Sequence, residues 1–320
     1  MSTSSRSTFR RKAFCHVAPR RLAFFSARLL PLIAALALGF GSSARADDMP
    51  ALNIPASTES HPGKFQWADL FADDAAKAAE FYTGAFGWTS TEVAAKNDRR
   101  VYLLKNGAET IASVVQRSAQ RKGTAPARWI GYAATNDLAS TLTAVVSAGG
   151  TVVAKARTVP DRGDQAIVTD AQGAVLGLIR SSSGDIPDYQ PQPGDLVWAQ
   201  LFTATPKNAA PFYEKIFGCQ SVVDTDHDDG QHLLLATGEI ARAGIAPSPP
   251  WEDDKPDWLI FFCVHDVDDV TKKATQLGGS VVVEPRNSTH GGRVAVIVDP
   301  QGGLVGLLEA EAAKQLKEAP

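Results

Sequence analysis

Hydrophobic and polar positions follow two periods between residues 64 and 310. Short runs rich in β-branched and aromatic residues predict strands, and longer segments with apolar residues at three- and four-residue steps predict helices. Helix ends are marked by glycines such as Gly87. In the first half the pattern predicts strands at 66–71, 100–105, 109–116, 129–134, 151–156, 165–169 and 175–179, and helices at 75–86 and 138–147. In the second half it predicts strands at 197–202, 232–236, 241–246, 258–264, 280–284, 294–298 and 304–308.

The second half repeats the first. Residues 67–88 and 198–219 are identical at ten of 22 positions without a gap, at a constant offset of 131. The likeness resumes at an offset of 129, where Gly149-Gly150 matches Gly278-Gly279. Such self-similarity indicates two copies of one structural unit.

Each copy shows the order strand, helix, three strands twice. Short strands that alternate with single helices predict an α+β fold with curled, mostly antiparallel sheets. We expect two tandem domains of this kind. The predicted boundaries are a signal peptide at 1–46, an N-terminal linker at 47–63, domain one at 64–181, a linker rich in Ser, Pro and Gly at 182–194, domain two at 195–310 and a tail at 311–320.

The first 46 residues differ in composition from the repeat. They contain eight basic residues and no acidic one, and an apolar run from Leu29 to Phe40 precedes Ala44-Arg45-Ala46. This combination is typical of a secretory signal peptide, and Arg10-Arg11 or Arg20-Arg21 leaves a twin-arginine signal open. Because the run is shorter than the ~20 residues that span a bilayer, we expect cleavage rather than an uncleaved anchor, and a periplasmic or secreted protein.

Loss of this segment changes the charge. The whole chain carries −3, and without the eight basic residues 24 basic and 35 acidic residues leave −11. Such acidity disfavours nucleic acid and anionic membranes as partners. Cys219 and Cys263 remain in a compartment that permits disulfides, but their pairing depends on a distance that the sequence leaves open.

The motifs resemble those of the glyoxalase/bleomycin-resistance/dioxygenase superfamily, also called vicinal oxygen chelate proteins. They are the W-x-D-L…F-Y…F-G-W run from Trp67, the Gly-Gly pair after the second helix, and Asp170-Ala-Gln-Gly173, matched by Asp299-Pro-Gln-Gly302. The resemblance covers about residues 64–310 and implies paired βαβββ modules around a cleft. It specifies no reaction, because the fold hosts isomerases, dioxygenases, thiol transferases and drug-binding proteins.

Metal-dependent members of that superfamily carry His or Gln on the first strand of each module and Glu near its last strand. A divalent ion needs such imidazole or carboxylate ligands. The matching positions here hold other residues: Trp67, Trp198, residues near Ile130 and Leu259, Gly177, Gly306, Ala112-Ser113 and Ala243-Gly244. The resemblance therefore implies clefts without a metal or other cofactor.

A second candidate for a cation is the acidic stretch from Asp224 to Gly230, which contains His227. It is similar to a calcium loop, but Gly230 comes one place late and Leu235 stands where the bidentate Glu belongs. Short Asp/Gly clusters are typical of turns, so the sequence favours a solvated turn.

Strand alternation puts Trp67, Asp69 and Phe71 on one face. If this face lines the cleft, Asp69 could act as a general base. Its counterpart Gln200, beside Trp198, can hydrogen-bond but cannot titrate. We expect ligand contacts from Trp67, Tyr102, Trp198 and Gln200, whereas core packing is the alternative for both tryptophans.

Three classes of function stay open. The sequence favours a metal-free protein that binds a small organic molecule in an aromatic cleft, chiefly in copy one. The first alternative is a metal-independent lyase or isomerase that uses Asp69 as its base. The second, a metal-dependent glyoxalase or dioxygenase, is disfavoured by the lost ligand positions. The sequence leaves open whether the protein is an enzyme, and its oligomeric state.

Overall fold

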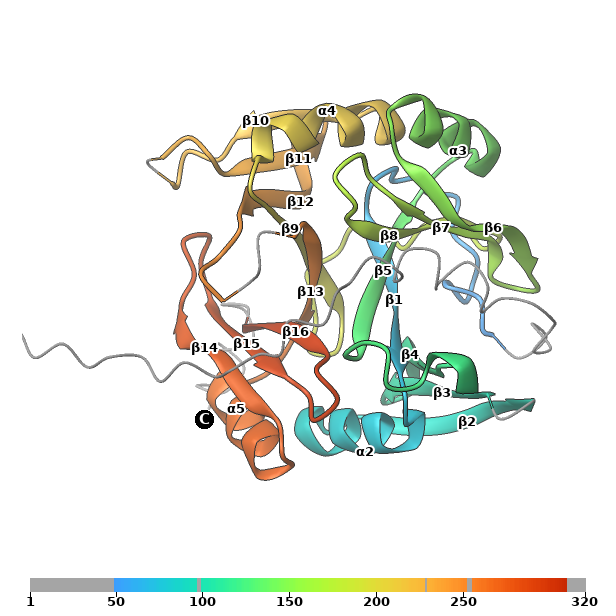
Figure 1. Cartoon of the computed structure of the whole chain (residues 1–320), viewed down its shortest axis with the longest axis vertical. Coiled ribbons are helices and arrows are strands. Elements are labelled where there is room, and N and C mark those ends of the chain that lie inside the picture. Colours follow the sequence, from blue (N-terminus) through green and yellow to red (C-terminus); the bar gives the residue numbers. More distant parts are fainter. Residues whose placement is uncertain (1–48, 97–98, 228, 252–254, 310–320) are drawn as a thin grey trace, which may run out of the picture. The chain divides into compact units, whose positions relative to one another are not determined.

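The structure is a computed structural model that describes residues 49–96, 99–227, 229–251 and 255–309. The predicted signal peptide and tail lie outside these residues. The described chain forms two eight-stranded sheets, one from each copy of the repeat (Figure 1). The predicted α+β fold with two tandem domains is thereby confirmed. No helix in the described ranges is long and apolar enough to cross a membrane.

Each domain consists of two modules of one strand, one helix and three strands. Domain one contains β1 (Phe65–Ala72), α2 (Ala75–Phe86), β2 (Thr89–Lys96), β3 (Arg99–Asn106), β4 (Glu109–Gln116), η3 (Ala119–Arg121), β5 (Arg128–Ala134), α3 (Leu138–Ser147), β6 (Thr151–Val159), β7 (Gly163–Thr169) and β8 (Val175–Ser181). Domain two contains β9 (Leu196–Thr203), α4 (Pro206–Phe217), β10 (Gln220–Val223), β11 (Leu233–Thr237), β12 (Ile240–Pro247), β13 (Asp257–Cys263), α5 (Val267–Gln276), β14 (Ser280–Asn287), β15 (Arg293–Val298) and β16 (Leu304–Glu309).

The two sheets share one strand order. Sheet one runs β2-β3-β4-β1-β5-β8-β7-β6, and sheet two runs β10-β11-β12-β9-β13-β16-β15-β14. In the centre of sheet one, β1 is parallel to β4 and antiparallel to β5, which is parallel to β8. The remaining neighbours are antiparallel. Each module's first and last strands therefore meet at the middle of the sheet.

The sequence pattern did not locate the edge strands β2 and β10. Residues Thr89–Glu92 and most of β10 are exposed. An exposed edge strand needs no alternation of apolar and polar residues, because neither of its faces has to be buried. The structure thus supplies the fourth strand of these two modules, the one directly after the helix.

Local sequence explains the helix ends. The Asp74 side chain caps α2 by accepting a hydrogen bond from Lys77 N. Gly87 ends the helix with a φ of 76°, a left-handed conformation that favours glycine. In α4, Pro206 stands at the first turn, where the missing N–H has no partner to lose.

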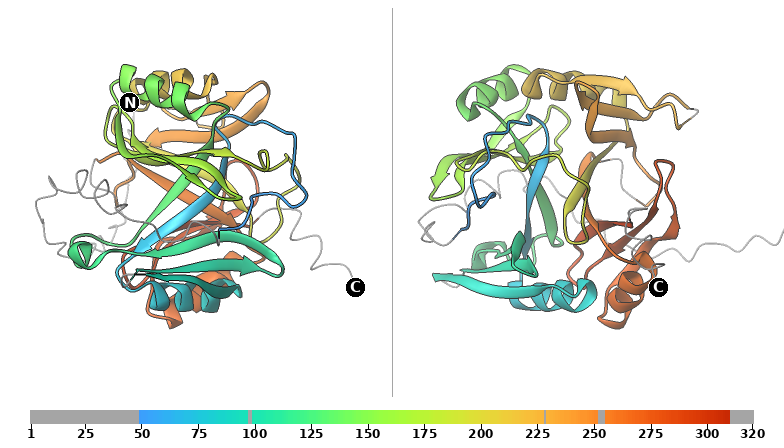
Figure 2. Two further views of the ribbon diagram at one scale, coloured as in Figure 1. Left: turned by 90° about the vertical axis from the view of Figure 1, so that its right-hand side faces the viewer. Right: turned by 180° about the vertical axis from the view of Figure 1, so that it is seen from behind.

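One apolar core joins the two domains. The cluster includes residues of all four α-helices and of the central strands of both sheets. Helix α2 lies beside α5, and α3 lies beside α4 (Figures 1 and 2). Aromatic rings cross the boundary: Phe65 and Trp258 are 4.8 Å apart between centroids, and Trp129 and Phe262 are 5.3 Å apart. The domains therefore share their largest core.

Two reciprocal hydrogen-bond sets also connect the domains. Tyr82 donates to Asp299 Oδ2 at 3.0 Å and accepts from Trp129 Nε1 at 2.9 Å. The repeat-related set joins Tyr213, Asp170 and Trp258: Tyr213 donates to Asp170 Oδ2 at 2.8 Å and accepts from Trp258 Nε1 at 3.1 Å. The F-Y and D-x-Q-G motifs, which identify the repeat, thus hold its copies together.

Candidate functional site

The candidate site lies on the face of sheet one that points away from the shared core, here called the outer face. In β1, Ala68 and Leu70 belong to the shared core. Trp67, which alternates with them, belongs to a second apolar cluster on the outer face, with Phe71 packed against it. The same alternation puts Asp69 on the outer face, where it is only 6% exposed.

Asp69 accepts hydrogen bonds from two neighbours. Its Oδ1 accepts from Trp67 Nε1 at 2.7 Å and from Ser113 Oγ at 2.6 Å. Ser113 lies opposite Asp69 in the β1–β4 register. Burial raises the pKa of Tyr132 well above its ordinary value, and the nearby Asp69 carboxylate raises it further. Asp69, Ser113 and the indole nitrogen of Trp67 thus form a hydrogen-bonded polar cluster at the middle of the sheet.

Arg162 completes this group from the turn between β6 and β7. Its side chain is fully buried, and its Cζ lies 3.7 Å from the centroid of the Trp67 ring. Burial lowers its pKa to about 10, while the Asp69 charge opposes that shift. The Nε group donates to Pro50 O at 2.8 Å, but within residues 49–309 as described neither terminal guanidinium nitrogen has a hydrogen-bond partner. This arrangement can accept an anion with two oxygens.

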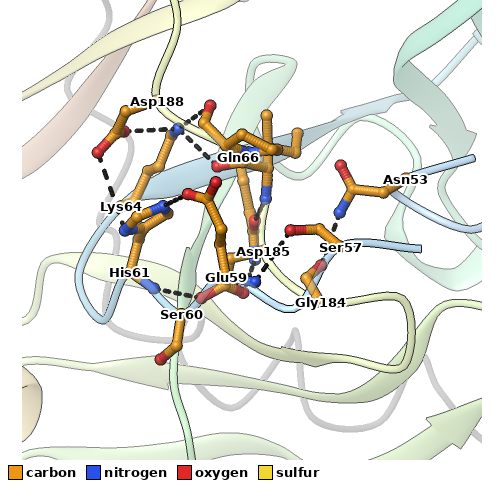
Figure 3. A network of polar contacts seen from close by, with 12 residues as sticks. Asn53, Ser57, Glu59, Ser60, His61, Lys64, Gln66, Gly184, Asp185 and Asp188 are labelled. Carbon is orange, nitrogen blue, oxygen red and sulfur yellow. Dashed lines mark hydrogen bonds and ion pairs between the residues drawn. The ribbon is translucent and has the colours of Figure 1, made fainter. Parts of the chain in front are cut away.

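The segment from Met49 to Lys64 is held against domain one. Asn53 N donates to Ser183 Oγ at 3.1 Å. His61 N donates to Asp185 Oδ2 at 2.6 Å (Figure 3). Lys64 Nζ donates to Asp188 Oδ1 at 2.9 Å. The two predicted linkers therefore bond to each other, and the second also bonds to Lys64 at the start of domain one.

The first residues of this segment cover the outer face. Met49 and Leu52 pack against the apolar cluster that contains Trp67. Pro50 supplies the carbonyl oxygen that pairs with Arg162. Residues 49–54 are called the strap below. A pocket over β5, β6 and β7 is lined by Tyr132, Ala154, Lys155, Arg157, Gln165, Ala166 and Ile167.

Domain two keeps the indole of this site but loses its polar residues. Trp198 Nε1 donates to Gln200 Oε1 at 3.1 Å, as Trp67 does to Asp69. Gly244 replaces Ser113, and a Cβ there would overlap the Gln200 side chain. Domain two therefore has an uncharged amide, Gln200, where domain one has the Asp69 carboxylate. The remaining replacements are Phe261 for Tyr132 and Gly291 for Arg162.

Aromatic rings cover the glycines at the positions of the expected Glu ligands. Gly177 lies opposite Tyr132 in the β5–β8 register, and Gly306 lies opposite Phe261 in domain two. A Cβ at either glycine would overlap the facing ring. The space that a ligating side chain would need is therefore filled by the neighbouring strand.

The structure separates Tyr102 from the other predicted site residues. Tyr102 lies opposite Val114, which belongs to the shared core, and its ring packs against that core. Its hydroxyl donates to Glu92 Oε2 at 2.9 Å. Trp67 and Asp69 lie together in domain one, and Trp198 and Gln200 lie together in domain two.

Sequence reasoning missed Arg162 and Tyr132. An arginine in a hairpin turn is ordinarily solvated, so the sequence of this turn gave no sign that Arg162 is buried. The signal that could have found it is the repeat itself, because Gly291 stands at the equivalent position. Cys219 and Cys263 are both buried thiols, and burial raises the pKa of Cys219 to about 11.

Comparison with known proteins identifies the class. The family model described as Glyoxalase/Bleomycin resistance protein/Dioxygenase superfamily matches residues 64–178 and 195–307. The chain belongs to this superfamily, as its motifs predict.

Two relatives match most of the chain. The Mycobacterium bovis protein named "Putative glyoxylase CFP32" is 30% identical over 258 residues, which cover 80% of this chain and 98% of that protein. Anthracycline biosynthesis protein DauV of Streptomyces sp. strain C5 is 29% identical over 271 residues, covering 79% and 95%.

Solved structures show the same fold. The Mn(II)-bound glyoxalase of Novosphingobium aromaticivorans has a TM-score of 0.55 and 13% identity, and covers 78% of this chain and 83% of its own. The 2,3-dioxygenase LapB of Pseudomonas sp. KL28 has a TM-score of 0.56 and 14% identity, covering 78% and 93%. At these identities the likeness concerns the fold alone.

Proposed function

We propose that the protein is exported and binds a small, planar organic acid on the outer face of domain one, with no metal at the centre of the sheet. The observation that carries this proposal is Arg162, whose buried guanidinium lies on the Trp67 ring and whose terminal nitrogens have no hydrogen-bond partner among the described residues. Leaving buried charged donors unpaired is unfavourable, so a ligand that pairs with them gains affinity.

The chemistry of the site selects the ligand class. A guanidinium matches a carboxylate with two parallel hydrogen bonds. The surrounding indole and the apolar cluster favour a flat, apolar body. One relative, DauV, is named for the biosynthesis of anthracyclines, and we extend to this chain only the idea of a planar aromatic ligand. The strap then has to move, because Pro50 O holds Arg162 Nε and two apolar side chains lie above it.

Two features support binding without a metal at the centre of the sheet. Gly177 and Gly306 leave no ligand side chain at the positions where the family places Glu. The facing rings of Tyr132 and Phe261 lie over those positions. Asp69 is the one acidic residue of β1, and its Oδ1 already accepts two hydrogen bonds.

The same hydrogen bonds favour a binding protein over an enzyme that uses Asp69 as its base. Asp69→Asn separates the two, because it keeps the size of the side chain and removes the base. A binding protein keeps its ligand affinity, whereas a base-dependent enzyme loses turnover by ~10²–10⁴-fold.

A thermal-shift screen of mature protein (residues 47–320) tests the proposed ligand class. The panel pairs planar aromatic carboxylic acids with their neutral amides. A ligand at 100 times its Kd stabilises by about 2.7 kcal/mol, and we expect such shifts only from carboxylates. Equal shifts from acids and amides, or none, would contradict the proposal. Export is checked separately by mass spectrometry, where an intact N-terminus in the cytosol would oppose it and a start at Asp47 supports it.

A further inference from the structure

Two turns at opposite edges of sheet two come into contact. Residues 224–232 connect β10 to β11, and residues 288–292 connect β14 to β15. Strands β10 and β14 are the first and last strands of this sheet. His290 Nε2 nevertheless lies 2.9 Å from Asp224 Oδ2. The contact therefore bridges the two edges of the curled sheet.

Carboxylates and imidazoles converge at this contact. Asp224 is only 5% exposed, and its Oδ2 is the oxygen nearest the histidines. His290 Nε2 also lies 3.7 Å from Asp226 Oδ2, and His227 Nε2 lies 3.7 Å from Asp224 Oδ2. One donor atom each from Asp224, Asp226 and His290 lie within 4.8 Å of one another.

Two of these three spacings are close to those of a tetrahedral transition-metal site. With Zn–N and Zn–O bonds of about 2.0–2.2 Å, ligand atoms on a tetrahedron are roughly 3.3 Å apart. The observed separations of 2.9 and 3.7 Å lie on either side of this value. Mixed imidazole and carboxylate donors suit Zn²⁺ and its neighbours in the first row.

We propose that Asp224, Asp226 and His290 bind one divalent transition-metal ion of the Zn²⁺ class. His227, whose Nε2 lies 3.7 Å from Asp224 Oδ2, is a candidate fourth ligand. The remaining position takes water when His227 does not bind, as in open three-ligand sites.

Neighbouring groups hold the imidazoles in place. Thr289 Oγ1 lies 3.2 Å from His290 Nδ1, which leaves Nε2 of that ring for the metal. His232 stacks on His227 with 3.8 Å between ring centroids. His232 Nδ1 is also 3.1 Å from Asp229 Oδ1. Contacts to the second ring nitrogen, such as that at His290 Nδ1, are common around metal-binding histidines.

The site belongs to domain two alone and is separate from the centre of the sheet. At the offsets of the repeat, domain one has Val93 in place of Asp224 and Asp161 in place of His290. The residues at the middle of sheet two, among them Gln200 and Phe261, lie on its central strands rather than in these turns. A bound ion would connect the two sheet edges, so it should stabilise domain two.

Titration of metal-stripped mature protein with Zn²⁺, followed by calorimetry, tests the proposal. We expect one ion per chain and a raised melting temperature. His290→Ala should weaken binding by more than ~10-fold, and Co²⁺ should give the intense visible absorption of a tetrahedral site in the wild type only. His290 is suited to this test because its side chain is 46% exposed, so its loss leaves the core intact.

The matched control is His265→Ala, which removes an exposed histidine outside the cluster and should leave Zn²⁺ affinity unchanged. The proposal is overturned if the wild type binds no Zn²⁺, or if His290→Ala binds it as tightly as the wild type. Equal losses in both histidine variants would also overturn it, because they would indicate adventitious surface binding.

Discussion

Removal of one hydroxyl at the boundary between the domains should measurably destabilise the protein. Tyr82 is fully buried and its hydroxyl has two partners, Asp299 Oδ2 and Trp129 Nε1. Tyr82→Phe keeps the ring and its contacts but leaves both partners without this bond. The change therefore isolates the hydrogen bonds of the F-Y motif from its packing.

The magnitude follows from the groups left unpaired. A buried polar group that loses its partner costs about 1–3 kcal/mol. The Asp299 carboxylate keeps two other hydrogen bonds in the variant, because its Oδ1 accepts from Gln301 N at 2.7 Å and from Gly303 N at 3.0 Å. With the Trp129 donor also unpaired, we expect Tyr82→Phe to lower the free energy of unfolding by about 2–4 kcal/mol.

Urea denaturation of mature protein near neutral pH measures this loss. Tyr213→Phe breaks the repeat-related set with Asp170 and Trp258 and should cost a similar amount. Tyr102→Phe is the control, because its hydroxyl bond to Glu92 is exposed, and its effect should stay within ~0.5 kcal/mol. If Tyr82→Phe is no more destabilising than Tyr102→Phe, the two sets do not hold the domains together.

The pH dependence gives a second check on the same variant. Burial raises the pKa of Asp299 above its ordinary value, and the bond from Tyr82 opposes that shift. A raised carboxyl pKa means that the folded state favours the protonated form, so stability falls as pH rises through the folded pKa. Without Tyr82 the charged form loses a donor. The destabilisation should therefore be largest near neutral pH and smaller around pH 4, where more Asp299 is protonated.

Three further variants test other parts of the account. Gly177→Ala should lower the free energy of unfolding by about 1–3 kcal/mol in urea denaturation, because the new Cβ overlaps the Tyr132 ring. A simultaneous Tyr132→Ala should remove this overlap. If the loss in the double variant equals the sum of the two single losses, the overlap is contradicted. Asp188→Asn should destabilise at neutral pH, because hydrogen bonds and charge from Arg242 and Lys64 hold the Asp188 pKa well below its usual range. The stabilisation by the Asp188 carboxylate is present above ~pH 4 and is lost as pH falls towards the folded pKa. Melting curves at several pH values measure the difference between the wild type and Asp188→Asn. A difference that persists in strong acid would contradict this prediction. Trp67→Ala should cost ~3–5 kcal/mol, since Trp67 is 2% exposed, and chemical denaturation showing no loss would place the ring outside the core.

The repeat allowed most of the fold to be predicted. In β1, α2 and their copies one face is buried, so apolar residues recur in the sequence at the spacing of a strand or a helix. The edge strands β2 and β10 left no such period, because most of their residues are exposed. The pairing of Tyr82 with Asp299 was equally out of reach, since it joins residues 217 positions apart.

The site was only partly predictable. Alternation in β1 put Trp67 and Asp69 on one face, and the structure has them bonded there. Arg162 and His290 could not be placed, because each lies in a turn between an edge strand and its neighbour, and its position depends on how far the sheet curls. The sequence favoured a solvated turn around His227, and only the fold brings His290 to it.

The central claim is that Arg162 makes the outer face of domain one an acid-binding site that needs no metal. Calorimetric titration with the best carboxylate from the screen, in the presence of a chelator, tests it directly in wild type, Arg162→Met and Trp198→Ala. The account predicts that wild type and Trp198→Ala bind equally, and that Arg162→Met loses at least ~10-fold in affinity with the loss of its charged hydrogen bonds. Binding that survives Arg162→Met, that is lost in Trp198→Ala, or that disappears with the chelator would contradict it.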